Sequence, residues 1–179
     1  MTPETKEKTS IREATLTDAP SIAAVHVAAW KKTYNEQIPE EFLNRLNIDK
    51  YTWNWESWLA YPSTPEARTW VVVYDDRIVG FAGVGPCRDD DMDLGDAMEI
   101  HGIYFHPDIW RLGLGRALMQ WIFDDLRRRD YNLLTLWTLE ANKRARSFYE
   151  SLGMTADGET KVDFKDGFEL DEIRYTITL

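Results

Sequence analysis

The chain has little cysteine and little histidine, and this removes several kinds of chemistry. Cys87 is the single cysteine, so the chain can form neither an internal disulfide nor a cysteine-based metal cage. The three histidines lack the spacing of paired ligands, and we expect no metal site. Cys87 also has no base near it in the sequence, so we interpret it as a structural thiol rather than an acyl-carrying nucleophile.

Long apolar runs are missing as well. No uninterrupted apolar stretch approaches the roughly 20 residues that a membrane-spanning helix needs. The first ten residues, MTPETKEKTS, are polar and lack the apolar core of a signal peptide. We therefore expect a soluble, cytoplasmic protein with no membrane partner.

Positive charge is scarce. The chain has 21 Lys and Arg residues against 31 Asp and Glu residues, and its net charge is −10. This balance argues against a nucleic-acid partner, because phosphates would be repelled unless basic residues were clustered on one face. The surplus acid is compatible with a cationic substrate, and equally with a role in solubility alone.

The remaining composition is that of one ordinary domain. The chain has 179 residues, of which 44% are hydrophobic, and shows no repeat or linker that would separate domains. Residues 1–8 are expected to form a flexible tail and residues 9–179 a single domain.

Hydrophobic patterning predicts a mixed α/β order. Strands are expected over Ser10–Ala14, Thr69–Tyr74, Ile78–Gly85, Ala97–Phe105, Leu133–Leu139, Met154–Phe164 and Phe168–Leu179. Helices are expected from Asp18 to about Tyr34, from Pro39 onward, and over Lys50–Ala60, Leu112–Arg129 and Asn142–Leu152. The segment Asp89–Asp96 is expected to be an acidic loop.

The sharpest local feature is the segment from Trp110 to Arg116, between an expected strand and a strongly periodic helix. Gly113 and Gly115 remove side chains at the start of the helix, where unpaired N–H groups and the helix dipole can hold a pyrophosphate. A tight turn would explain the same glycines. The dinucleotide fingerprint requires a third glycine at the position of Leu118, and the P-loop motif is absent, so both of these alternatives fail.

Three segments together resemble the acetyl-CoA core of the GNAT superfamily of N-acetyltransferases. They are Glu99–Pro107, the Gly113/Gly115 loop and Asn142–Tyr149. The family loop is written (Gln/Arg)-x-x-Gly-x-(Gly/Ala), and here Trp110 stands where Gln or Arg is usual. The downstream pattern Asn-x-x-Ala-x-x-Phe-Tyr matches without a gap.

The resemblance implies the GNAT (acyl-CoA N-acyltransferase) fold, an α/β fold with a central mixed sheet of about seven strands flanked by helices. It implies that the strands 97–105 and 133–139 splay apart where pantetheine inserts. The co-substrate would be acetyl-CoA, with direct transfer to a primary amine in a ternary complex. The residues expected to bind it are Ile103, Tyr104, Phe105, Arg111, Leu112, Gly113, Leu114, Gly115, Arg116, Asn142, Ala145, Arg146 and Tyr149. Homodimers are common in the family.

The transfer needs a base for the acceptor ammonium and benefits from an acid for the leaving thiolate. In the GNAT pattern, Tyr149 lies near the sulfur of CoA and is our candidate acid. Glu99 resembles the catalytic Glu of the histone-acetylating branch, whereas His101 can act near neutral pH without any shift. The base is therefore Glu99, His101 or an ordered water.

The acceptor side is rich in aromatic residues. We expect Trp30, Tyr34 and Glu99 to contact the acceptor, with aromatic faces receiving an alkylammonium. The acidic run of Asp89, Asp90, Asp91, Asp93 and Asp96 is suited to attract a polyamine or a basic peptide, and is equally explained as a solvated loop. As acceptor we favour a polyamine or another small amine over a peptide. The alternative from another class is a catalytically weak acetyl-CoA-binding sensor or regulatory module.

Overall fold

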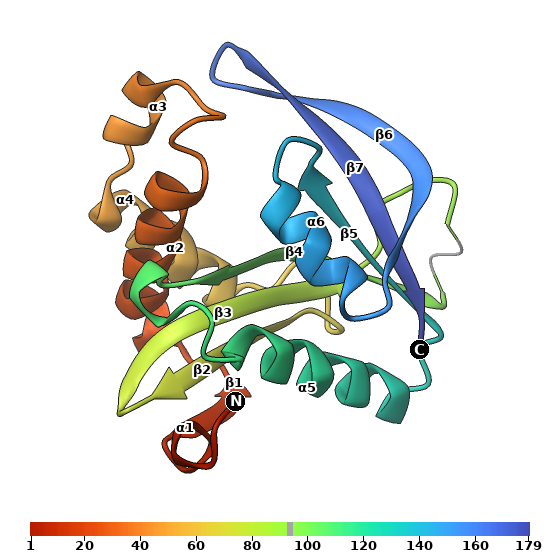
Figure 1. Ribbon diagram of the computed structural model, residues 1–179, viewed down its shortest axis with the longest axis horizontal. Helices are drawn as coiled ribbons and strands as arrows, with labels where there is room; N and C mark the ends of the chain where they lie inside the picture. Colours follow the sequence, from red (N-terminus) through yellow and green to blue (C-terminus); the bar gives the residue numbers. More distant parts are fainter. Residues whose placement is uncertain (93–94) are drawn as a thin grey trace. The chain divides into compact units, whose positions relative to one another are not determined.

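The computed structural model describes residues 1–92 and 95–179. Its helices are α1 (Pro3–Glu7), α2 (Ala19–Thr33), α3 (Glu40–Asn44), α4 (Ile48–Ala60), α5 (Leu114–Arg128) and α6 (Lys143–Glu150), with short 3₁₀ turns at Leu16–Asp18 and Pro107–Ile109. Its strands are β1 (Thr9–Glu13), β2 (Arg68–Tyr74), β3 (Arg77–Pro86), β4 (Ala97–Phe105), β5 (Leu133–Leu139), β6 (Thr155–Lys165) and β7 (Phe168–Thr178) (Figure 1). Each expected strand is confirmed to within one residue at either end.

Hydrogen bonds join the strands in the order β1-β2-β3-β4-β5-β7-β6, which confirms a mixed seven-stranded sheet. Strands β1, β2 and β3 pair antiparallel, as do β5, β7 and β6. The pair β4–β5 is parallel, and its register runs from Ala97↔Leu133 to Ile100↔Leu136. This ladder covers four residues of each strand, although β4 continues to Phe105 and β5 to Leu139.

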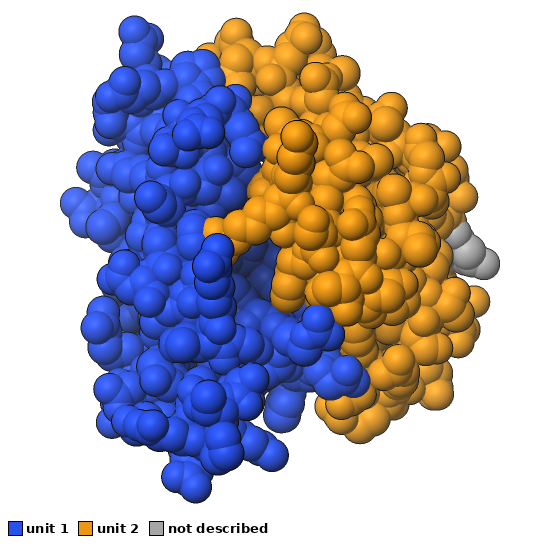
Figure 2. Space-filling view, in the orientation of Figure 1, with its two compact units in different colours: residues 1–84, 102–122 blue, residues 85–101, 123–179 orange. Residues whose placement is uncertain are grey.

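The chain divides into two compact units (Figure 2). The first comprises residues 1–84 and 102–122, and the second residues 85–101 and 123–179. Strands β3 and β4 and helix α5 each contribute residues to both units.

In the first unit, α2 and α4 pack beside one another over a buried apolar core. This core contains Ile22, Val25, Trp55, Val71 and Phe81. Asp18 precedes α2, is 7% exposed, and accepts hydrogen bonds from the Arg12 guanidinium at 2.7 and 2.9 Å and from the Thr15 backbone at 2.7 Å. These bonds hold the pKa of Asp18 at about 2, with the Arg12 pair as the largest cause.

The hairpin turns follow from residues that accept a left-handed backbone. Asp75 and Asp76 join β2 to β3 with φ of 51° and 61°, and Asp166 and Gly167 join β6 to β7 with φ of 47° and 92°. Two consecutive positive φ angles match the twist of paired strands, which explains why these short polar residues close both hairpins. Strands β6 and β7 form a long two-stranded ribbon in the second unit (Figure 1).

The N-terminal residues differ from the flexible tail that we expected, because Pro3–Glu7 form the short helix α1. Thr2 caps this helix by accepting a hydrogen bond from the Thr5 backbone at 3.2 Å, and Pro3 is well suited to a first helical turn. No helix in the described part of the chain is long and apolar enough to cross a membrane.

Candidate active site

The loop before α5 has the backbone that the glycine pattern predicted. Arg111 and Gly113 both have positive φ, 69° and 81°, and α5 begins directly after them at Leu114. Trp110, which replaces the Gln or Arg usual in the family pattern, donates its indole N–H to the Phe105 carbonyl at 3.0 Å. The departure from the pattern therefore adds an anchor between this loop and the end of β4.

Gly113 also has no room for a side chain. A Cβ built on it would lie 2.8 Å from the backbone nitrogen of Met1. Arg111 and Arg116 are exposed on either side of this position, whereas Leu114 is 1% exposed and packs inside. Backbone N–H groups and two cations thus gather at the first turn of a 15-residue helix.

The residues predicted at the end of β4 are half-buried. A Cβ on Gly80 would overlap the Phe105 ring, so that ring fills space beside β3. Tyr104 stacks on His26 with ring centroids 4.8 Å apart. Ile103 lies on the same strand between Gly102 and Tyr104.

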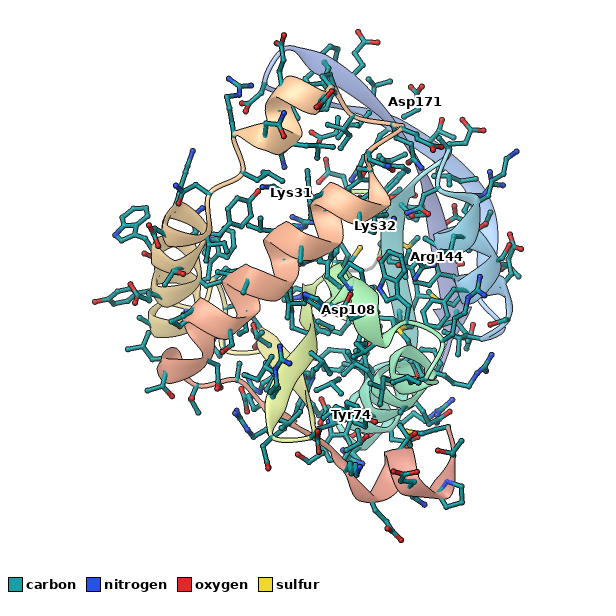
Figure 3. All side chains as sticks on the ribbon, turned by 60° about the vertical axis from the view of Figure 1, so that its left-hand side comes forward. Lys31, Lys32, Tyr74, Asp108, Arg144 and Asp171 are labelled. Atoms are coloured by element: carbon teal, nitrogen blue, oxygen red, sulfur yellow. The ribbon has the colours of Figure 1, made fainter. Side chains whose placement is uncertain are left out.

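Helix α6 begins with the predicted asparagine. The side-chain oxygen of Asn142 accepts the Ala145 N–H at 3.1 Å, which makes Asn142 the N-cap. Arg146 donates to the Tyr175 hydroxyl at 3.2 Å and to the Glu140 carbonyl at 3.1 Å. Both of these hydrogen-bond partners are neutral groups. The guanidinium of Arg146 therefore contributes a positive charge to the first turns of α6. Arg144, labelled in Figure 3, belongs to the same helix.

Tyr149 is 7% exposed and packs against two aromatic rings of the second unit. Its ring centroid lies 5.9 Å from that of Tyr175. The Tyr175 hydroxyl donates to Glu150 at 2.7 Å, and burial raises the pKa of this hydroxyl. Tyr175 therefore links both ends of α6 to β7, beside the predicted acid.

Glu99 is buried, with 1% exposure, and accepts hydrogen bonds from Arg88, a residue that the sequence did not single out. Its Oε2 accepts the backbone N–H of Arg88 at 3.2 Å and the side-chain Nε–H at 3.0 Å, and its Oε1 accepts from Nη2. The buried carboxylate raises the pKa of the Arg88 guanidinium. Glu99 is thus the buried member of an ion pair whose other member, Arg88, is exposed.

His101 lies two residues further along β4. Its Nε2 is 3.3 Å from the Pro86 carbonyl oxygen and 3.8 Å from Glu99 Oε2. Burial lowers the pKa of His101, the charge of Arg88 lowers it further, and Glu99 partly opposes both. Near neutral pH the ring is therefore uncharged. Because a carbonyl can only accept, Nε2 carries the proton and Nδ1 keeps its lone pair.

The acidic loop is not the free acidic surface that we expected. Arg174, 3% exposed on β7, donates to Asp89 at 3.2 Å, to both oxygens of Asp91 at 2.7 Å and to Asp157 at 2.7 Å. The Trp137 indole N–H adds a bond to Asp89 at 3.0 Å. Asp89 and Asp91 are therefore anchored to β7, which removes these two residues from the predicted polyamine-attracting surface. Asp93 lies outside the described residues.

The predicted acceptor residues belong to an aromatic cluster in the first unit. Trp30 is 8% exposed and packs edge-on against Tyr34, with centroids 5.1 Å apart. The cluster centres on His26, which contacts the rings of Trp30, Tyr51, Trp55, Phe81 and Tyr104. The Trp55 indole donates to His26 Nδ1 at 3.3 Å. Lys31 and Lys32, labelled in Figure 3, are exposed in the last turn of α2.

Sequence reasoning missed four residues of these arrangements: Arg88, Arg174, Tyr175 and His26. His26 carried a weak signal, since it precedes Trp30 by four residues and so shares its helix face. Arg88, Arg174 and Tyr175 carried none, because their partners are distant in the sequence. Within residues 1–92 and 95–179, no three His, Cys, Asp or Glu side chains are grouped so as to hold a metal ion.

Comparison with known proteins places this geometry in a family. Residues 27–154 match the acetyltransferase (GNAT) family. YuaI of Bacillus subtilis, named as an uncharacterized N-acetyltransferase, is 30% identical over 167 residues that cover 92% of this chain and 87% of YuaI.

Solved structures share the fold. The ribosomal-protein-alanine N-acetyltransferase of Brucella melitensis has a TM-score of 0.72 at 23% identity, covering 95% of this chain and 99% of its own. The yncA protein of Salmonella typhimurium, solved with acetyl-CoA, has a TM-score of 0.67 at 21% identity, covering 96% and 94%.

The fold is therefore that of an N-acetyltransferase. The chain belongs to the GNAT family and is an acetyl-CoA-dependent N-acetyltransferase.

Proposed function

We propose that this enzyme transfers the acetyl group of acetyl-CoA to the primary amine of a small molecule, by direct attack of the amine. The observation that carries the proposal is the loop at Arg111 and Gly113, where two residues with left-handed backbone lead into the start of α5 and Gly113 itself has no side chain. Because the family match spans parts of both units, we treat residues 9–179 as one catalytic domain. A cytoplasmic location stays a prediction.

The first turn of α5 fits the pyrophosphate of the co-substrate. The unpaired N–H groups of Gly113–Gly115 and the positive end of the helix dipole favour an anion. Arg111 and Arg116 supply positive charge locally in a chain whose net charge is −10. The strand residues Ile103, Tyr104 and Phe105 and the helix residues Asn142, Ala145 and Arg146 complete the proposed binding set.

His101 is our proposed base among the three alternatives. It is uncharged near neutral pH, so its Nδ1 can accept the proton of an ammonium without first losing one. Glu99 would have to give up hydrogen bonds from Arg88 in order to do the same. In this proposal Glu99 instead supports His101, and an ordered water can carry the proton between the amine and Nδ1.

Tyr149 is our proposed acid. Its hydroxyl can donate a proton to the CoA thiolate as the carbon–sulfur bond breaks, so that free CoA leaves as the thiol. The packing of its ring against Tyr175, which α6 holds through Arg146 and Glu150, supports a fixed position for this hydroxyl. A donor held in place contributes more than a mobile one, because it needs no reorganisation.

We keep Trp30 and Tyr34, in the aromatic cluster around His26, as proposed acceptor contacts. Trp30 and Tyr34 offer ring faces that attract an alkylammonium. A polyamine has less support than a compact amine, because Asp89 and Asp91 are already bound to Arg174.

Calorimetric titration with acetyl-CoA, paired with thiol release in the presence of primary amines, tests this function. We expect saturable binding of acetyl-CoA and thiol release that depends on the amine. Binding without release across amines, amino acids and peptides would favour the sensor alternative, and absence of binding would contradict the proposal.

A further inference from the structure

Arg88 combines a fixed position with an exposed guanidinium. Its side chain is 63% exposed, while the Glu99 side chain that it binds is 2% exposed. Nε and one N–H of Nη2 serve Glu99, which leaves three of the five guanidinium N–H groups. Among the described residues, Glu99 is the only side chain that the structure shows bonded to Arg88.

The backbone on both sides of Arg88 is anchored. The N–H of Cys87 donates to the Ala97 carbonyl at 3.1 Å, which fixes the chain just before Arg88. Asp89, just after it, is bonded to Trp137 and Arg174. An arginine held by its own side chain and by both neighbours loses little further freedom when it binds a ligand.

Arg88 is also close to the proposed base. Glu99 Oε2 lies 3.0 Å from Arg88 Nε and 3.8 Å from His101 Nε2, so both groups lie within 4 Å of one oxygen. The imidazole of His101 and the guanidinium of Arg88 are therefore neighbours around one carboxylate, and an amine bound at His101 has an exposed cation in its surroundings. A planar guanidinium matches the two oxygens of a carboxylate.

We propose that the acceptor carries a carboxylate close to its amine, and that Arg88 binds this carboxylate while His101 serves the nitrogen. The acceptor class is then an amino acid, or another short amine bearing an acid group. This inference rests on the proposed function and names its substrate. In an α-amino acid one carbon separates the nitrogen from the carboxyl group, a short span suited to two protein groups that share one oxygen of Glu99.

Charge supports the same class of acceptor. The chain has a net charge of −10, so an anionic substrate needs a local cation. Asp89 and Asp91 on the neighbouring loop already have a cationic partner, because both accept hydrogen bonds from Arg174, which is 3% exposed. Arg88 is thus an accessible cation next to acids that are already paired.

The test compares three acceptors that differ only at the carboxyl group: L-leucine, L-leucinamide and 3-methylbutylamine. Thiol release is measured with saturating acetyl-CoA, and amine concentrations are corrected for the fraction that is unprotonated. We expect kcat/KM for L-leucine to exceed that for the other two by about 10- to 100-fold, as loss of a charge-assisted pair implies. Other L-amino acids are compared with their amides in the same assay, so that the result does not depend on whether the enzyme accepts the leucine side chain.

Two variants and a control assign the effect to Arg88. R88Q should raise KM for the amino acid by about 10- to 100-fold and leave KM for the amide within about twofold. R88K keeps a positive charge beside Glu99, so it should fold even if R88Q does not. Its KM for the amino acid should lie between those of the wild type and R88Q. R127Q removes an exposed arginine of α5 paired with Asp124 and should change neither value.

The outcomes are distinguishable. Equal use of amino acid and amide by the wild type, or use of peptides alone, would overturn the carboxylate inference while leaving acetyl transfer intact. An equal loss with all amines in R88K, without a change in KM, would mean that Arg88 acts on the thioester instead. Acetyl-CoA binding without thiol release for any amine would contradict the proposed function itself.

Discussion

The backbone N–H of Arg88 and its guanidinium both donate to the carboxylate of Glu99, which is 1% exposed. A strand carboxylate with no partner would be an obvious base, but this one is already occupied. The pair instead sets the electrostatic environment of His101, because one member lowers the pKa of the imidazole and the other raises it. The opposing effects of Arg88 and Glu99 on the pKa of His101 can therefore be measured by replacing each residue separately.

The pH dependence of kcat/KM should show an acidic limb governed by His101. Since burial and Arg88 lower the pKa of His101 below its ordinary 6.5, the midpoint of this limb should lie below pH 6.5, with activity lost as the pH falls. H101Q should lower kcat by about 10²- to 10⁴-fold, the usual contribution of a positioned base. Initial rates across a pH series give both quantities.

Opposite shifts of this limb provide the control. E99Q removes a negative charge that raises the His101 pKa, so the limb should move to lower pH. R88Q removes a positive charge that lowers the pKa, so the limb should move to higher pH. Shifts in the same direction, or none, would show that another group governs the acidic limb.

Replacement of Tyr149 by phenylalanine tests the acid. Y149F keeps the packing against Tyr175 but removes the hydroxyl, so kcat should fall by about 10²- to 10⁴-fold. The acetyl-CoA Kd from calorimetry should stay within about twofold, because the ring remains in place. Y131F, made at a residue that packs against Arg129 after α5, should leave both unchanged. Unaltered turnover of Y149F at every pH would rule out the acid role.

The co-substrate loop is tested at Gly113. G113V places a branched side chain at φ 81° and where the N–H groups face outward, so the acetyl-CoA Kd should rise at least about tenfold, the equivalent of 1.4 kcal/mol. G158V is the control for backbone strain alone, because Gly158 has φ 99° and nothing within 4 Å of a built Cβ, whereas a Cβ on Gly113 also meets Met1. Both variants should lose stability through backbone strain, but only G113V should lose affinity. Equal acetyl-CoA affinities of G113V and G158V would contradict a pyrophosphate site at Gly113.

Acid stability is tested at Asp18. Its folded pKa of about 2 lies below the ordinary 3.8, so its charge stabilises the fold above pH 4 by about 2 kcal/mol, and this contribution is lost as the pH falls through 2. D18N should therefore unfold more easily than the wild type at pH 7, with the difference in free energy of unfolding shrinking toward pH 2. Chemical denaturation at several pH values measures it. D124N, at an exposed ion pair of α5, should change the free energy of unfolding little at pH 7 and at pH 2.

Local patterning predicted the fold well. Strands β4 and β5 were placed to the residue, because both are rich in apolar residues and are bounded by polar segments. The turns at Asp75–Asp76 and Asp166–Gly167, which separate the expected strands, consist of residues that accept positive φ. The helix α1 was missed because its five residues carry no hydrophobic period, only the cap at Thr2.

The site was predicted less completely, and the physical reason is sequence distance. The candidate residues lie within motifs, but their partners do not: Arg88 reaches Glu99 across a loop, and Arg174 reaches Asp89 from the far end of the chain. Hydrophobic periodicity does not predict such side-chain pairs, because they depend on which strands become neighbours in the sheet. The acidic run was misinterpreted for this reason, because its paired cation was invisible in the local sequence.

The ion pairs of Arg174 also limit where new chain termini can be introduced by circular permutation. Three carboxylates from two separate segments converge on it, so chain ends opened at Asp90 would pull Asp89 and Asp91 apart and leave a buried cation without its partners. Ends opened at the Asp166–Gly167 turn would leave Arg174 and Asp157 on intact strands. A circular permutant or a grafted tag therefore belongs at the tip of the β6–β7 ribbon, where new termini disturb only a turn.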